Sequence, residues 1–186
     1  MVRKVFFSFH YEEDSWRAAI VRNNWITKED RQAAGYIDAA DWEEIKEEGD
    51  EAIKEWIDEQ MKGTSVTAVL IGAETSDREW VQYEVKKSHE LGKGMLAIHI
   101  HDLKNNDQKT CAKGDCNFGP IGEDEEGNPI YFIDKYVEYE WVDEDGYENL
   151  GDWVETAAKD AGIGKQMKET PYTGSGKQRR SGGRFA

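Results

Sequence analysis

The chain has 186 residues and a formal net charge of −15 at pH 7. That length fits one domain, or one domain with an elaboration, and seven Trp, eight Tyr and six Phe supply the large apolar side chains of a core. Residues 171–186 hold four basic and no acidic side chains, so residues 1–170 are more acidic than the chain as a whole. Because contacts with phosphates need Lys and Arg, neither nucleic acid nor an anionic membrane is an expected partner of this acidic body.

The N-terminal segment and the cysteines predict a cytoplasmic protein. The apolar run at residues 5–9 is too short for a secretory signal, and no apolar stretch approaches the roughly 20 residues that span a bilayer. Cys111 and Cys116 lie in a polar segment. Two reduced thiols are their plain interpretation in a cytoplasmic protein.

The first third of the chain predicts a strand followed by helices. Residues 3–9 are β-rich and apolar, as in a buried strand. Asp14 or Ser15 is a suitable N-cap for a first helix. Residues 27–41 are typical of a loop, and apolar residues then recur at helical spacing over residues 42–61.

Two further strands follow, with a helix between them. Residues 65–71 and 95–100 predict buried strands, and residues 78–91 predict the helix that connects them. Alternating strands and helices imply right-handed crossovers, and therefore an α/β fold with a parallel central sheet and helices on both faces. Sheets of this kind bind ligands beyond the carboxyl ends of their strands.

The pattern weakens after residue 102. Residues 104–128 are polar and Gly-rich, which is typical of a long loop or an insertion. Residues 130–133 and 137–142 predict short strands that pair as an edge hairpin. Residues 149–161 predict a final helix.

These elements predict one domain at residues 1–165. Its core is expected at residues 3–102 and its C-terminal elaboration at residues 103–165. Residues 166–186 are basic and rich in Gly and Ser, which is typical of a flexible tail. No internal repeat interrupts this organisation.

A carboxylate and an indole lie one turn apart in the helix predicted at residues 78–91. Trp80 and Glu84 occupy positions i and i+4, which share a helical face. The preceding strand ends near Gly72, so both side chains are expected at the carboxyl edge of the sheet. A carboxylate beside an aromatic ring can stabilise a cationic sugar there, which makes Glu84 the candidate catalytic residue. The alternative is a solvated helix face, where most glutamates lie.

Several nucleotide-binding and hydrolase motifs are absent from the sequence. No Gly-x-Gly-x-x-Gly follows the first strand, and neither a Walker A loop nor a Gly-x-Ser-x-Gly elbow occurs. Residues 69–73 lack the Asp that a phosphorelay receiver needs at the end of a central strand. The sequence therefore disfavours Rossmann dinucleotide binding, P-loop phosphoryl transfer, α/β-hydrolase chemistry and receiver function.

A small metal site is the alternative role for the cysteines. His99 and His101 alternate on one face of the strand that precedes Cys111 and Cys116. Four ligands at a recognised spacing would indicate zinc, but His-x-His followed by Cys-x4-Cys is not a standard pattern. The sequence therefore predicts no metal site and no bound cofactor.

Two segments resemble the Toll/interleukin-1-receptor (TIR) domain family. Residues 5–10 resemble its first-strand box, an apolar strand that closes on Ser followed by an aromatic residue. Residues 76–85 resemble its helix box, in which Ser is followed by Trp and, four residues after the Trp, Glu. Three further segments are similar to those of the TIR-like proteins of Thoeris anti-phage systems: residues 22–25, 34–42 and 64–72. The likeness extends over about residues 4–102 and implies a TIR-like, flavodoxin-like fold.

The resemblance implies an enzyme that consumes NAD. In enzymatic TIR domains the Glu after Trp cleaves the nicotinamide–ribose bond, so Glu84 inherits that catalytic role by resemblance. Thoeris members are described as making a cyclic ADP-ribose isomer, a small-molecule signal that switches on a separate effector. NAD is then a substrate rather than a cofactor. The segment at residues 38–42 corresponds to a loop that covers the pocket and takes part in TIR–TIR self-association.

Six further residues are expected to contact this substrate. Trp80 lines the pocket by resemblance, and His10 and Tyr11 stand where other TIR enzymes place basic residues. Aromatic rings near the strand ends are candidate stacking faces for nicotinamide or adenine. The predicted substrate-binding residues are Phe6, Ser8, His10, Tyr11, Trp42 and Trp80.

Two other functions remain open at the level of sequence. A TIR-like adaptor without catalysis, acting by protein–protein assembly, suits an acidic surface with an exposed loop. A nucleoside-processing transferase would use the same carboxylate on a different glycoside. Nicotinamide release from NAD separates the adaptor from the enzyme, and substrate profiling would reveal the transferase.

Overall fold

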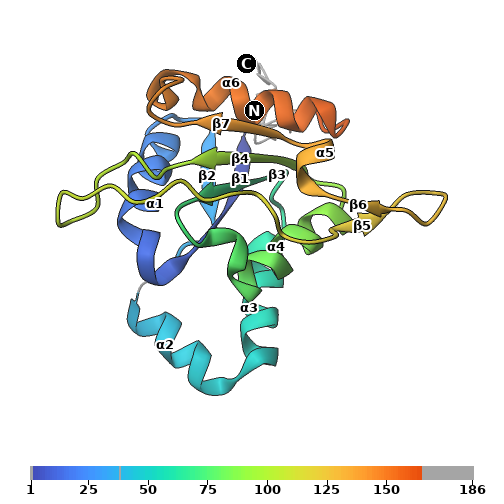
Figure 1. Ribbon diagram of the computed structural model, residues 1–186, viewed down its shortest axis with the longest axis horizontal. Coiled ribbons are helices and arrows are strands. Elements are labelled where there is room, and N and C mark those ends of the chain that lie inside the picture. Colours follow the sequence, from blue (N-terminus) through green and yellow to red (C-terminus); the bar gives the residue numbers. More distant parts are fainter. Residues whose placement is uncertain (1, 38, 165–186) are drawn as a thin grey trace, which may run out of the picture.

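A computed structural model describes residues 2–37 and 39–164, and in this part of the chain five parallel strands form the central sheet (Figure 1). The strands lie in the order β2-β1-β3-β4-β7. Their bounds are β1 (Arg3–Phe9), β2 (Arg31–Ala34), β3 (Val66–Ile71), β4 (Gly94–His99) and β7 (Val137–Glu140). The parallel sheet confirms the predicted α/β class.

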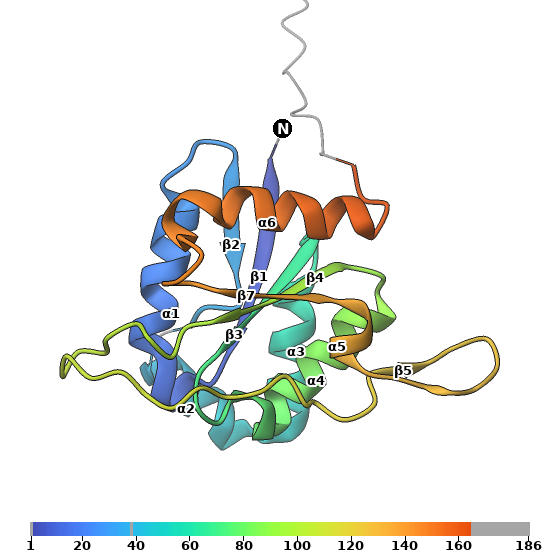
Figure 2. The same ribbon diagram turned by 45° about the horizontal axis from the view of Figure 1, so that its top comes forward.

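Helices cover both faces of this sheet. They are α1 (Tyr11–Ile26), α2 (Ala39–Glu48), α3 (Asp50–Met61), α4 (Glu79–Glu90), α5 (Phe132–Lys135) and α6 (Gly146–Asp160), with a 3-10 turn η1 (Thr75–Asp77) before α4. Helices α1 and α6 pack on one face and α3 and α4 on the other (Figures 1 and 2). The central strands β3 and β4 are buried along their whole length, as expected when both faces are covered.

Alternation along the strands divides the core between the two faces. Val5 and Phe7 of β1 pack with α1 and α6, and Trp25 of α1 is almost fully buried there. Phe6 points to the other face, where it packs with α2 and α3. Successive side chains of a strand point to opposite faces, so the aromatic run of β1 supplies both cores.

The prediction of a loop at residues 27–41 is wrong in part, because this segment contains β2. This strand runs parallel to β1, with Arg31 opposite Arg3. The first helix begins at Tyr11, and Asp14 is buried inside it rather than serving as its cap. The long helix predicted at residues 42–61 is two helices, which are separated at Gly49 by a backbone φ of 98°.

The predicted edge hairpin of residues 130–133 with 137–142 is also wrong. Strand β7 instead extends the main sheet beside β4, with Leu96 opposite Val137. A small antiparallel hairpin forms earlier, from β5 (Gly122–Glu123) and β6 (Pro129–Ile130). Without β7, this edge of β4 would expose a row of unpaired backbone donors and acceptors, and β7 forms hydrogen bonds with them.

Segment 103–121 lacks helix and strand, as predicted, but it is packed against the sheet and crosses the molecule (Figure 2). Cys116, Phe118 and Ile121 are buried beside β3 and β4. The Arg17 guanidinium of α1 donates to the Leu103 carbonyl at 2.8 Å. The elaboration therefore contributes to the core of the domain.

Every helix between residues 2 and 164, residue 38 aside, is too short or too polar to cross a bilayer. The tail predicted at residues 166–186 lies outside the described residues, and so does Asp38 of the predicted pocket-covering loop. The extent of the domain, 1–165, stays a prediction.

Candidate functional site

Glu84 is a buried carboxylate at the contact between α4 and β1. The side chain lies on the inner face of α4, and the residue is 8% exposed. The Ser8 hydroxyl of β1 donates a hydrogen bond to Glu84 Oε2 at 2.5 Å. Ser8 can reach it because alternation along β1 turns Ser8 toward the α4 face, whereas Phe7 and Phe9 point away from it.

The surroundings of Glu84 disfavour its charged form. Burial raises its pKa to about 8, and the Ser8 hydrogen bond lowers the pKa only in part. Within residues 2–37 and 39–164, no Lys, Arg or His forms an ion pair with Glu84. A carboxylate without a cation partner is suited to stabilise a cation that arrives with a ligand.

Glu84 opens onto a cavity of about 230 Å³ at the carboxyl end of β1. Aromatic rings in contact with one another form part of its wall. The Tyr11 and Trp42 ring centroids are 5.7 Å apart, and those of Trp42 and Trp56 are 6.1 Å apart. The lining residues are Phe7, Phe9, His10, Tyr11, Glu12, Gly35, Ile37, Trp42, Lys46, Trp56, Arg78, Glu79, Trp80, Val81 and Glu84.

The structure brings most of the predicted site residues together. Glu84 and four of the predicted substrate-binding residues line this cavity: His10, Tyr11, Trp42 and Trp80. Ser8 lies behind the wall, in contact with Glu84. Phe6 is fully buried in the core with α2 and α3 and does not line the cavity.

The chain segment after β2 covers one side of the cavity. Gly35 has a φ of 81°, and a Cβ atom there would lie 2.4 Å from the Phe7 carbonyl oxygen. Glycine therefore allows the backbone to pass close to β1 before it turns outward. Ile37 and Trp42, which follow, both face the cavity.

The sequence model of the family described as "Thoeris protein ThsB, TIR-like domain" matches residues 6–105. The chain belongs to this family. It is also 33% identical, over 191 aligned residues, to the Bacillus cereus protein named "Putative cyclic ADP-D-ribose synthase ThsB1". The alignment covers 83% of this chain and the whole of that protein.

Ten of the fifteen lining residues were not among the predicted site residues, and three of these ten add positive charge or aromatic surface to the cavity. Lys46 of α2 and Arg78 before α4 bring two cations to the cavity, and Trp56 of α3 extends its aromatic wall. Lys46 is one of two lysines in the acidic stretch 43–59, where it has the pattern of a solvated face. Arg78 precedes Trp80 by two residues, and this proximity in the sequence could have indicated that Arg78 also lines the cavity.

Two buried polar atoms at this cavity lack a hydrogen-bond partner among the described residues. They are His10 Nδ1 and Trp42 Nε1, and His10 Nε2 lies 3.1 Å from Glu12 Oε2. Buried polar groups are nearly always paired, so a ligand or water is expected to meet these atoms. The Trp42 indole can donate to a ligand oxygen.

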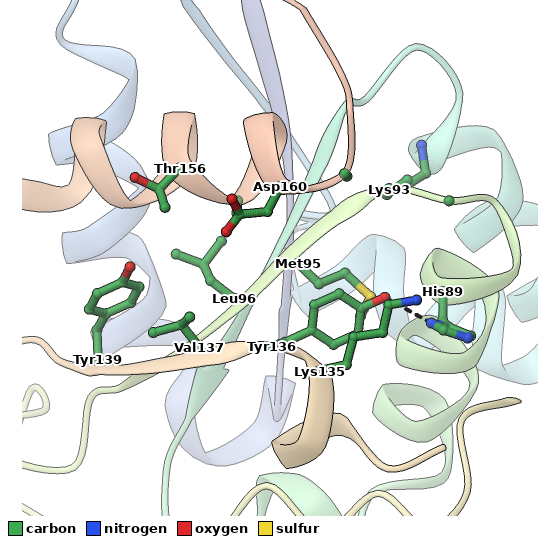
Figure 3. A pocket seen from close by; sticks show the side chains of 13 residues that line it. His89, Lys93, Met95, Leu96, Lys135, Tyr136, Val137, Tyr139, Thr156 and Asp160 are labelled. Carbon is green, nitrogen blue, oxygen red and sulfur yellow. Dashed lines mark hydrogen bonds between the residues drawn. The ribbon is translucent and has the colours of Figure 1, made fainter. Parts of the chain in front are cut away.

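A larger cavity of about 330 Å³ lies at the amino end of β4, between α4 and α6 (Figure 3). His89 Nδ1 lies 2.8 Å from the Tyr136 hydroxyl there, and burial raises the pKa of Tyr136 to about 12. The lining carboxylate, Asp160, is exposed. None of the residues predicted for the TIR-like site lines this cavity, so the Glu84 cavity is the candidate site.

Proposed function

We propose that this chain cleaves the nicotinamide–ribose bond of NAD and closes the remaining ADP-ribose into a cyclic product. The observation that carries the proposal is Glu84, a buried carboxylate without a cation partner that opens onto an aromatic-walled cavity. The name of the Bacillus cereus relative, "Putative cyclic ADP-D-ribose synthase ThsB1", supports it.

The bond-breaking step needs a carboxylate that stabilises positive charge, but it needs no proton donor for the leaving group. The bond between ribose C1′ and the pyridinium nitrogen breaks, and its electron pair leaves with nicotinamide, which becomes neutral. Positive charge then builds on the ribose, in a transition state that resembles an oxocarbenium ion. Glu84 is proposed to stabilise this charge from a site of low dielectric, where the effect is large. The pyridinium itself favours the charged form of Glu84 as the substrate enters.

Ring closure needs a nucleophile from the same molecule and the exclusion of water. A hydroxyl of the adenosine half attacks C1′ and forms the new C–O bond, and its proton passes to the Glu84 carboxylate. Covering of the cavity by Ile37 and Trp42 would restrict water, and proximity would favour the intramolecular attack.

The volume of the cavity limits which part of the substrate can enter it. About 230 Å³ is below the roughly 300–1,000 Å³ that is typical of small-molecule sites, so the nicotinamide riboside half is expected inside. The diphosphate would then lie at the rim, near Lys46 and Arg78. An open groove of about 650 Å³ shares Ile37 and Trp56 with the cavity and gives the adenosine half room to fold back.

The proposal includes the wider setting implied by the family. NAD acts as substrate and not as cofactor, and the cyclic product reaches a downstream effector in the cytoplasm as a small-molecule signal. Self-association through the segment at residues 38–42 would assemble the active form. In the structure, residues 39–42 belong to helix α2 rather than to a loop.

Nicotinamide release tests the proposal directly. Wild-type protein, Glu84→Gln and the matched control Glu90→Gln are incubated with NAD, in purified form and in lysates of phage-infected cells, and the products are followed by mass spectrometry. Glu90 is an exposed residue of the same helix. We expect Glu84→Gln to lose on the order of 10²–10³ in rate, as when one stabilising group is removed from other enzymes, and Glu90→Gln to match the wild type.

The same assay separates the enzyme from an adaptor. An active wild-type preparation in which Glu84→Gln retains full activity contradicts the role of Glu84. If the wild-type protein protects cells from phage and the lysates of those infected cells show no nicotinamide release, the protein is the non-catalytic adaptor instead.

A further inference from the structure

Two histidines and two glutamates gather where β4 and β7 lie side by side, away from the Glu84 cavity. His99 at the end of β4 is in register with Glu140 of β7. Glu138 lies two residues before Glu140, and His101 lies two residues after His99. Because alternate residues of a strand share a face, these side chains point to the same side of the sheet.

Three of these side chains lie close enough to share one ion. His99, His101 and Glu140 each offer a ligand atom, and these atoms lie within 4.8 Å of one another. The two imidazole rings are nearly perpendicular, at 87°, with centroids 6.1 Å apart. His99 is 3% exposed, so its orientation is fixed by packing.

Both histidines turn one nitrogen to a carboxylate, and among the described residues the other nitrogen has no hydrogen-bond partner. His99 Nε2 lies 2.8 Å from Glu138 Oε2, and His101 Nε2 lies 3.3 Å from Asp102 Oδ2. Among the described residues, the Nδ1 atoms of both rings are buried and have no hydrogen-bond partner. His101 Nδ1 is 3.9 Å from Glu140 Oε2.

This arrangement is the one that metal-binding histidines adopt. A metal-bound imidazole almost always donates its other N–H to a carboxylate or carbonyl, which fixes the ring and its tautomer. Glu138 and Asp102 stand in that outer position. An unpartnered nitrogen on a ring that is almost fully buried is otherwise disfavoured, because buried polar atoms are normally paired.

We propose that His99 Nδ1, His101 Nδ1 and Glu140 bind a divalent ion of the zinc class, with water in a fourth position. Two imidazoles and one carboxylate form a donor set that suits Zn²⁺, with an open fourth position. Lys113 forms an ion pair with Glu140 Oε1, so Oε2 remains directed to His101. The ion would link β4 to β7 without using any residue that lines the Glu84 cavity.

A second set of ligands shares His99 and must be distinguished. His99, Cys116 and Glu138 also offer atoms within 4.8 Å of one another. That site would require the His99 nitrogen that already faces Glu138, and a thiolate from Cys116. Cobalt separates the two sets, because bound Co²⁺ shows a thiolate charge-transfer band only if Cys116 is a ligand.

The experiment uses tag-free, metal-depleted full-length protein. Zn²⁺ is titrated by calorimetry, and Co²⁺ is titrated by visible absorption. We expect one ion per chain and no thiolate band. His101→Gln and Glu140→Gln should weaken binding at least about tenfold, and Glu138→Gln should weaken it by about 10–100-fold, as for other outer-shell partners. His89→Gln and Cys116→Ser are the matched controls and should bind as the wild type does.

A thermal melt shows whether each variant is folded and whether Zn²⁺ stabilises it. Zn²⁺ should raise the melting temperature of the wild type, because an ion that binds only the folded chain stabilises it, and this rise should be absent in His101→Gln. His101 is half-buried, so its replacement is expected to leave the metal-free fold intact. Absence of stoichiometric binding overturns the proposal, and so does a thiolate band that disappears in Cys116→Ser.

Discussion

Glu84 and Asp14 are both buried carboxylates on helices that pack against the sheet, but their surroundings differ. Glu84 on α4 is 8% exposed and accepts a hydrogen bond from the Ser8 hydroxyl. Asp14 on α1 is 1% exposed, and its Oδ1 accepts from Arg17 Nη1 at 2.8 Å. Burial raises the pKa of both groups, but the Arg17 guanidinium opposes the rise at Asp14.

The difference separates a structural carboxylate from the carboxylate that we propose to be catalytic. The guanidinium that pairs with Asp14 also donates to the carbonyls of Leu103 and Lys109, so the pair holds the elaboration against α1. Glu84 faces a cavity instead and has no cation partner in the described part of the chain. A desolvated charge without a partner lowers stability, and such a group is expected where it serves a ligand.

The largest effect on stability is expected from Arg17→Met. This change leaves the Asp14 carboxylate buried without its partner and removes the donors to the Leu103 and Lys109 carbonyls. Breaking one side of a buried ion pair typically lowers the free energy of unfolding by about 3–5 kcal/mol. Urea denaturation measures the loss, and hydrogen exchange should show faster opening of residues 103–111.

Lys62→Met is the matched control for that prediction. Lys62 and Glu59 form an ion pair on the surface, where their side chains are 70% and 64% exposed. Removing such a pair should change the free energy of unfolding by less than about 1 kcal/mol. Similar losses in both variants would show that the Asp14 pair is not a buried clamp.

A pH dependence of stability is the second expected effect, and it comes from Glu84. Its pKa in the folded protein is about 8, whereas an unfolded Glu has a pKa of about 4.3. The folded state therefore binds more protons between these values, and the free energy of unfolding falls as pH rises from about 4.3 to about 8.

Glu84→Gln isolates this contribution. The variant keeps a hydrogen-bond acceptor for Ser8 and cannot ionise, so it should gain stability relative to the wild type as the pH rises. Asp14 remains in both proteins, and its own titration cancels in the comparison. Urea denaturation at pH 5 and pH 8 measures the difference, and an equal difference at the two pH values would contradict a buried, neutral Glu84.

The sequence predicted those parts of the fold that have a local pattern. Continuous apolar runs identified β1, β3 and β4, and helical spacing identified α4 together with its Trp80–Glu84 pair. Strand β2 has only four residues, which are Arg, Gln, Ala and Ala, and its pairing with β1 comes from tertiary contacts. Strand β7 was recognised as a strand, but its partner lies about 40 residues away and has no local signal.

The candidate site was predictable to the same extent. Glu84 and its aromatic neighbours lie in segments with a recognisable pattern, and most of them reach one cavity. Lys46 and Trp56 both reach that cavity because the helical segment is interrupted at Gly49, so that α2 and α3 each present a side chain to it. His99 and His101 were noted in the sequence, but Glu138 and Glu140 become their neighbours only when β7 joins β4. Such juxtapositions depend on topology and are not visible in spacing.

The smallest expected effect is a shift in the pH profile of NAD cleavage in Ser8→Ala. The hydrogen bond from Ser8 lowers the pKa of Glu84, so its loss should raise that pKa further. The proposed reaction uses the charged carboxylate, and kcat/KM should therefore rise with pH as Glu84 loses its proton. In Ser8→Ala this rise should move to higher pH, by on the order of one unit.

The matched control for this shift is Ser76→Ala. The Ser76 hydroxyl donates to Asp115 at 2.8 Å, and Ser76 does not line the Glu84 cavity. The pH profile of this variant should coincide with that of the wild type. A Ser8→Ala profile that moves to lower pH, or that coincides with the wild type, would show that Ser8 does not stabilise the charged form of Glu84. In that case burial alone would set the pKa of Glu84, whereas the Arg17 guanidinium would still oppose the rise at Asp14.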